Sequence, residues 1–200
     1  MRKFDRYRVL VAIGAAVPSA VFAHGGLGES HDLLHGFMHP IGGLDHVLAM
    51  VAVGVTAAQL GGRALWAVPL SFVAMMAIAA AIGMFALALP GIEAGIALSV
   101  IVLGAVISLR VKLPVILAAA IVAVFAVFHG YSHGLEMAVA RSGVAFGLGF
   151  VAATALLHLT GIGLGLMVGR MALTRSQRIA QAGGSVIALV GVVLLAGTLN

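Results

Sequence analysis

A histidine and an aspartate–histidine pair lie close together where the first long apolar segment begins: His39, Asp45 and His46. On a continuous helix, His39 and His46 are seven positions apart and return to nearly the same face, with Asp45 beside His46. Met50, one turn beyond His46, would add a thioether. Imidazole nitrogen and carboxylate oxygen suit a borderline divalent transition-metal ion, so this group predicts a metal site. The alternative is a hydrogen-bonded Asp45–His46 pair that fastens helices together.

A second group of similar composition ends the fourth apolar segment, and it consists of His129, His133 and Glu136. If the helix continues that far, offsets of four and seven place all three side chains on one face. Gly130 and Gly134 weaken the expectation of a helix, and the alternative interpretation is a solvated loop. Together the two groups offer four imidazoles and two carboxylates.

Isolated polar residues give weaker signals. His158 lies near the middle of the fifth apolar segment, and it is either a packed histidine or a second station on an ion pathway. Glu93, at the start of the third segment, is either a ligand or an interfacial carboxylate. Four further residues could collect metal ions or form an ordinary polar tail: Glu29, His31, Asp32 and His35.

The composition indicates that these groups are carried by membrane-spanning helices. Of the 200 residues, 62% are hydrophobic and 8% charged, against roughly 25% charged in soluble domains. The apolar runs are close to the roughly 20 residues that a helix needs to cross a bilayer. We therefore expect an all-α polytopic bundle of six transmembrane helices, within a domain of residues 40–200. The expected helices cover residues 40–60, 65–88, 92–109, 113–133, 142–169 and 180–198.

The start of the chain has the pattern of a cleavable signal peptide over residues 1–23. Basic residues precede an apolar stretch from Val9 to Val17, and Ala23 ends a small-residue cleavage site. An uncleaved first helix is the alternative, although this stretch is short for a span. Cleavage would leave His24 as the amino terminus, whose amine and imidazole could chelate one ion together. Residues 24–39 then form a short extracytoplasmic arm, with Pro40 in the first turn of the first helix.

Basic residues in the short loops predict the orientation, because Lys and Arg are retained on the cytoplasmic side. With the mature amino terminus outside, only Arg141 of the loop cations falls outside. Six fall inside: Arg63, Arg110, Lys112, Arg170, Arg175 and Arg178. Both histidine groups then lie near the extracytoplasmic face of a bacterial inner membrane.

Several classes of function are disfavoured by what the sequence lacks. The net charge of +5 forms no nucleic-acid-binding patch, because residues 2–8 contribute +3 of it and the remainder is scattered. No cysteine is present, which excludes disulfides and thiolate ligands. No nucleotide-binding loop is present, which argues against direct ATP drive. No His-Glu-x-x-His motif is present either, which disfavours a zinc hydrolase, and we expect no enzyme.

The motifs resemble the two signatures of the HupE/UreJ family of nickel and cobalt permeases. One runs from His39-Pro40 through Asp45-His46 to Met50, and the other from Phe128-His129 through His133 to Glu136. The resemblance implies metal handling by His39, Asp45, His46, His133 and Glu136, and less firmly by Glu93. Ser132 departs from the small apolar residue expected there.

What the resemblance implies is a secondary permease for uptake of nickel, or of cobalt, with the ion and the bilayer as partners and no prosthetic group. Closely similar sites could also serve copper. Taken alone, the residues leave three other classes open: a haem-binding electron carrier, an intramembrane zinc hydrolase, and a metal sensor or storage protein. The sequence indicates no oligomeric state.

Overall fold

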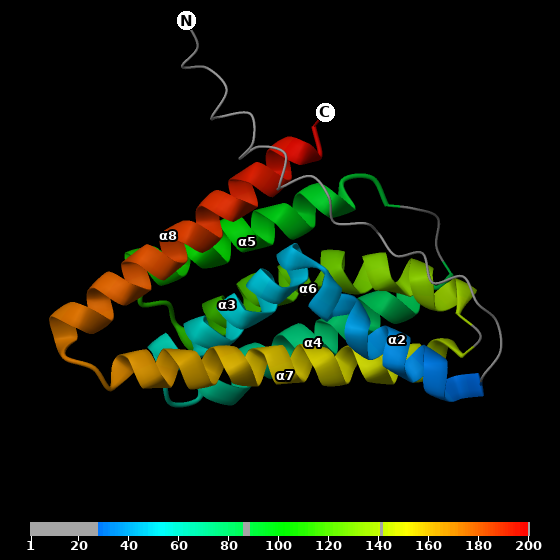
Figure 1. Ribbon diagram of the computed structural model, residues 1–200, viewed down its shortest axis with the longest axis horizontal. Coiled ribbons are helices and arrows are strands. Elements are labelled where there is room, and N and C mark those ends of the chain that lie inside the picture. Colours follow the sequence, from blue (N-terminus) through cyan, green and yellow to red (C-terminus); the bar gives the residue numbers. More distant parts are fainter. Residues whose placement is uncertain (1–27, 86–88, 141, 200) are drawn as a thin grey trace, which may run out of the picture.

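The chain folds into a bundle of helices in this computed structural model, which describes residues 28–85, 89–140 and 142–199. Over those residues there are seven helices and no strand (Figure 1). The helices are α2 (Gly28–Gly42), α3 (Leu44–Leu60), α4 (Ala64–Gly83), α5 (Ile92–Leu109), α6 (Val115–Val139), α7 (Gly143–Gly169) and α8 (Leu173–Gly197). The predicted all-α fold is confirmed for this part of the chain, whereas the signal peptide and His24 lie outside it.

The helices from α4 to α8 are all long and apolar enough to cross a membrane. The bent pair of α2 and α3 brings the five spans to six if the pair counts as one. Large apolar side chains such as Ile116, Leu159 and Val193 are exposed on the outside of the bundle, as lipid contact requires. The protein is therefore a multi-pass membrane protein, with about the number of spans that the apolar runs predict.

The first helix differs from the expectation in one respect that matters for the site. We expected a polar arm up to His39 and a continuous helix from Pro40, but α2 runs from Gly28 to Gly42 and includes Pro40. The chain then bends by 81° at Gly43, whose backbone is extended, before α3 begins. A proline removes one helical hydrogen bond and two glycines follow it, which explains a break here. His39 and His46 therefore lie on two helices and not on one face.

Two other helices extend beyond the expected boundaries. α6 continues to Val139, so His129, His133 and Glu136 lie on one continuous helix, as their predicted common face requires. α8 begins at Leu173 and not near residue 180. Its first two turns are polar but contain arginine and glutamine, which are good helix formers, so the helix begins before the apolar run does.

Glycines set the close approaches that hold the bundle together. A Cβ atom on Gly130 or Gly134 of α6 would meet the Met76 or Ala80 carbonyl of α4. These two glycines, which weakened the prediction of a helix, are the surface through which α6 packs on α4. Glycines similarly join α2 to α7 and α5 to α8, pairs that run side by side in Figure 1.

Candidate metal site

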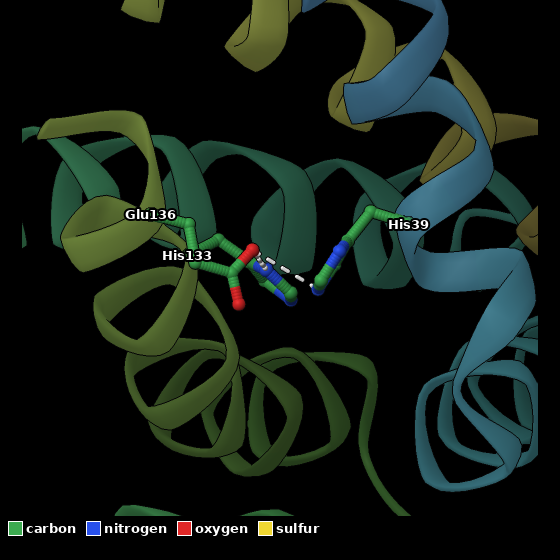
Figure 2. Close-up of side chains that lie close together, drawn as sticks. All are labelled: His39, His133 and Glu136. Carbon is green, nitrogen blue, oxygen red and sulfur yellow. Dashed lines mark ion pairs between the residues drawn. The ribbon is translucent and has the colours of Figure 1, made fainter. Parts of the chain in front are cut away.

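Glu136 lies between two histidines from different helices. Its Oε2 atom is 3.0 Å from His39 Nε2 on α2 and 3.5 Å from His133 Nδ1 on its own helix, α6 (Figure 2). One candidate ligand atom from each of these three residues lies within 4.8 Å of the others. Among the described residues, this is the group of histidines and carboxylates that is compact enough for one ion.

His46 joins this group from α3. Its Nε2 atom lies 2.8 Å from His133 Nε2, while its Nδ1 atom is 2.7 Å from Asp45 Oδ1. Asp45 Oδ1 also accepts the backbone N–H of His46 at 2.8 Å. When a carboxylate accepts the Nδ1 proton, the Nε2 lone pair of the same imidazole is free to bind a metal. Asp45 therefore orients His46 toward His133.

His129 is the innermost histidine of the group, and its ring centroid is 4.9 Å from that of His46. Its Nε2 atom is 3.1 Å from Ser99 Oγ on α5, and Ser99 donates its single proton to the Ile96 carbonyl at 2.6 Å. The serine oxygen therefore accepts from His129 Nε2, which leaves a lone pair on Nδ1. That Nδ1 atom is buried without a hydrogen-bond partner among the described residues. Sequence reasoning missed Ser99, because a single serine in an apolar run gives no signal.

Exposure decreases steadily along the group. The side chains of Glu136 and His39 are 39% and 31% exposed, whereas that of His46 is 10% exposed. His133 and His129 are buried, at 1% and 0%. The arrangement is therefore a polar path that begins at the surface and ends inside the bundle.

Aromatic rings enclose this path on the α7 and α4 sides. Phe150 of α7 packs against His133 with a centroid distance of 3.9 Å, and Phe146 contacts His39 at 6.0 Å. Phe72 of α4 contacts His129 at 5.5 Å. Apolar walls lower the local dielectric constant and strengthen the interaction of an ion with the carboxylates.

The other sequence candidates lie outside the compact group. Glu93 is exposed in the first turn of α5, and Met50 is fully buried in the apolar core one turn below His46. His158 is buried on α7 beneath Phe72. Of the expected arm, His31 and His35 are exposed, although the His35 ring lies 6.0 Å from that of His39.

Asp32 has a structural partner. Its Oδ2 atom accepts the backbone N–H of Ser142 at 2.6 Å, and Ser142 is the N-cap of α7. The carboxylate therefore fastens α2 to the start of α7. This contact occupies a residue that was a candidate for collecting metal.

The chain matches known proteins over nearly its whole length. The family model described as HupE / UreJ protein matches residues 11–194. A relative, Protein HupE from Rhizobium leguminosarum bv. viciae, is 44% identical over 183 residues, which cover 91% of this chain and 93% of that protein. No solved structure matches. Because the family model and this relative both span the helices that carry the histidine and carboxylate groups, the chain belongs to the HupE/UreJ family.

Proposed function

We propose that this protein is a secondary permease for uptake of a divalent transition-metal ion, with nickel as its first substrate and cobalt as its second. The ion binds to groups from α2, α3 and α6 at one end of the bundle. They are His39, Asp45, His46, His129, His133 and Glu136. No prosthetic group takes part.

The observation that carries the proposal is the spacing of the ligand atoms. Two ligands bound at about 2.1 Å to one ion lie about 3.0 Å apart at a right angle and about 3.4 Å apart at the tetrahedral angle. The separations of 3.0 and 3.5 Å that join His39 Nε2 and His133 Nδ1 to Glu136 Oε2 fall close to this range. The 2.8 Å contact with His46 uses the other nitrogen of His133, Nε2, so His46 belongs to the next binding position along the path. Adjacent imidazoles this close leave no gap for a porphyrin between them, which favours a bare ion over haem.

The exposure gradient supports a direction of movement. An ion exchanges its water first at the half-exposed Glu136 and His39, and then moves to His46 and His133, which are more buried. Successive binding stations keep each affinity moderate, as permeation requires. A closed site of high affinity would store the ion and not release it.

The basic linkers support entry from outside the cell. Arg63 follows the end of α3 that is remote from Asp45 and His46, and Arg110 and Lys112 precede the end of α6 remote from Glu136. Since basic linkers face the cytoplasm, the site faces the extracytoplasmic side of the inner membrane.

Ion flux into proteoliposomes tests this function. We expect the purified protein to carry nickel inward, to be inhibited more by cobalt than by zinc or copper, and to lose flux in His46→Ala. Binding of nickel without flux, in vesicles where a control channel conducts, would show a sensor or storage protein and not a permease.

A further inference from the structure

We propose that His158 is a second, inner station for the transported ion, and that the ring of Phe72 separates it from the outer cluster. The outer cluster is the set of six residues named in the proposed function, on which this inference rests. His158 lies on α7, whereas the outer cluster is carried by α2, α3 and α6.

His158 has no structural contact that explains a histidine. It is 1% exposed, and neither ring nitrogen has a hydrogen-bond partner among the described residues. Buried polar atoms in proteins are nearly always hydrogen-bonded, and an intramembrane imidazole is costly without a function. A leucine would fill the same space without that cost, so the nitrogens are available for a ligand.

The position of His158 continues the path of the outer cluster. Phe150, Thr154 and His158 follow one another at intervals of four residues, and all three are buried on the side of α7 that faces the bundle interior. Phe150 packs on His133, and His158 is eight residues further, about 12 Å along the helix axis. The imidazole therefore lies below the outer cluster, toward the middle of the span.

Phe72 lies between the two stations. Its ring centroid is 5.5 Å from that of His129 and 5.2 Å from that of His158, which it meets edge to face. The phenylalanine is fully buried and packs against both imidazoles, and we take its ring as the barrier to passage between them. A change of its side-chain rotamer would open that passage, which makes the ring a gate between the stations.

Two further polar or polarisable side chains lie one turn away on the same two helices, on the side of the outer cluster. Thr154 of α7 and Met76 of α4 are four residues from His158 and Phe72, and the Thr154 hydroxyl lies 3.8 Å from the Met76 sulfur. One imidazole without a carboxylate makes a weaker site than the outer cluster. An inner station should bind more weakly, because the ion must leave it.

A cavity lies beyond His158, toward the end of the bundle that carries the basic linkers. It has a volume of about 870 Å³ and is formed by α3, α5, α7 and α8. Leu164 and Gly165 line it, about 9 Å along α7 from His158. The described residues around it include no histidine or carboxylate, so His158 is the last imidazole on the way in.

The direct test replaces His158 with leucine, which keeps the volume and removes the nitrogens. We expect His158→Leu to bind nickel at the outer cluster as the wild type does and to unfold at the same or a higher temperature. Nickel flux into proteoliposomes should fall at least about tenfold, the lower range for loss of a metal-site partner. Thr160→Val is the control on the same helix, because Thr160 is exposed and its hydroxyl bonds only to the Leu156 carbonyl.

Flux at the wild-type rate in His158→Leu would overturn the inference. So would a loss of outer nickel binding or of thermal stability together with flux, because His158 would then be a packing residue. If the wild type carries no nickel, the proposed function fails and the inference fails with it. The two failures can be told apart, because the first is seen in the wild type and the second only in His158→Leu.

A second variant tests occupancy and does not depend on flux. The chain has no cysteine, so His158→Cys introduces a single thiol at the inner station. We expect nickel to slow alkylation of that thiol in an otherwise wild-type protein, and not when His46→Ala removes the outer route. Ala152→Cys, on the exposed face of α7, is the control and should react equally with and without nickel. Alkylation of His158→Cys that nickel leaves unchanged would contradict an inner station.

Discussion

The hydroxyl of Ser99 illustrates how a residue outside the proposed ligand set can fix the tautomer of a proposed ligand. Because its proton goes to the Ile96 carbonyl, Ser99 accepts from His129 Nε2 and leaves the Nδ1 lone pair unpartnered. Asp45, itself one of the proposed ligands, has the equivalent effect on His46 through Nδ1. Both contacts set a tautomer in advance, which lowers the cost of binding an ion.

Removing the hydroxyl of Ser99 should therefore weaken nickel binding. We expect Ser99→Ala to lower the affinity about 10-fold, in the range seen for partners of metal-bound histidines, and Ser99→Thr to restore it. Ser71→Ala is the matched control, since the Ser71 hydroxyl bonds to two backbone carbonyls. Equal affinity in Ser99→Ala and wild type, measured by calorimetry, would rule out this role.

Glu136 contributes charge as well as an oxygen atom. Glu136→Gln keeps the shape but removes the carboxylate shared by His39 and His133. We expect nickel affinity to fall about 10- to 100-fold, with little change in thermal stability because the side chain is 39% exposed. Glu136→Asp keeps the charge on a shorter side chain, so its nickel affinity should lie between those of the wild type and Glu136→Gln. If the glutamine variant binds nickel as tightly as the wild type, the charge of Glu136 does not contribute to binding.

At the scale of elements, the bend between α2 and α3 brings His39 to the site. The helices themselves were predictable, because an apolar run long enough to span a bilayer can hardly form any structure other than a helix. α5, for example, matches its predicted bounds. The bend was not predicted, although Pro40, Gly42 and Gly43 were its signal. The extension of α6 was uncertain because the contact that stabilises it, Gly130 and Gly134 against α4, involves a helix remote in sequence.

The two glycines at the bend provide a matched pair of variants. A Cβ on Gly43 would lie 2.8 Å from Asp45 Oδ1 and 3.0 Å from His46 Nδ1, whereas a Cβ on Gly42 would meet nothing within 4 Å. Gly43 has φ of −97°, so alanine can adopt its backbone. We expect Gly43→Ala to displace the Asp45–His46 pair and lower nickel affinity, and Gly42→Ala to bind normally. Isothermal titration of both variants decides this, and equal affinities would contradict it.

For the whole molecule, the decisive property is that both histidine groups lie at one end of the bundle. The sequence predicted this, because successive spans cross the membrane in opposite directions and the first span therefore begins on the side where the fourth one ends. Alternation gives the depth in the membrane and not the lateral approach of α2 to α6 that brings His39 to Glu136. The lateral order of helices depends on contacts such as Gly54 against Gly161, which no local pattern reveals. Phe72 was missed for the same reason.

The orientation of the bundle can be tested with single thiols, because the chain lacks cysteine. Pro90→Cys lies in the linker before α5 and Lys112→Cys in the linker after it. We expect a membrane-impermeant maleimide to label Pro90→Cys in intact cells, and Lys112→Cys only after permeabilisation. The reverse pattern would place the histidine cluster on the cytoplasmic side and turn uptake into export.

The coordination shell of the bound ion tests the central claim most directly. X-ray absorption at the nickel edge of the purified protein should show nitrogen and oxygen neighbours at about 2.1 Å, with the outer-shell scattering of several imidazoles. That imidazole scattering should weaken in His133→Ala. A shell of water-like oxygen atoms without imidazole, or a spectrum unchanged in His133→Ala, would contradict an ion held by this cluster.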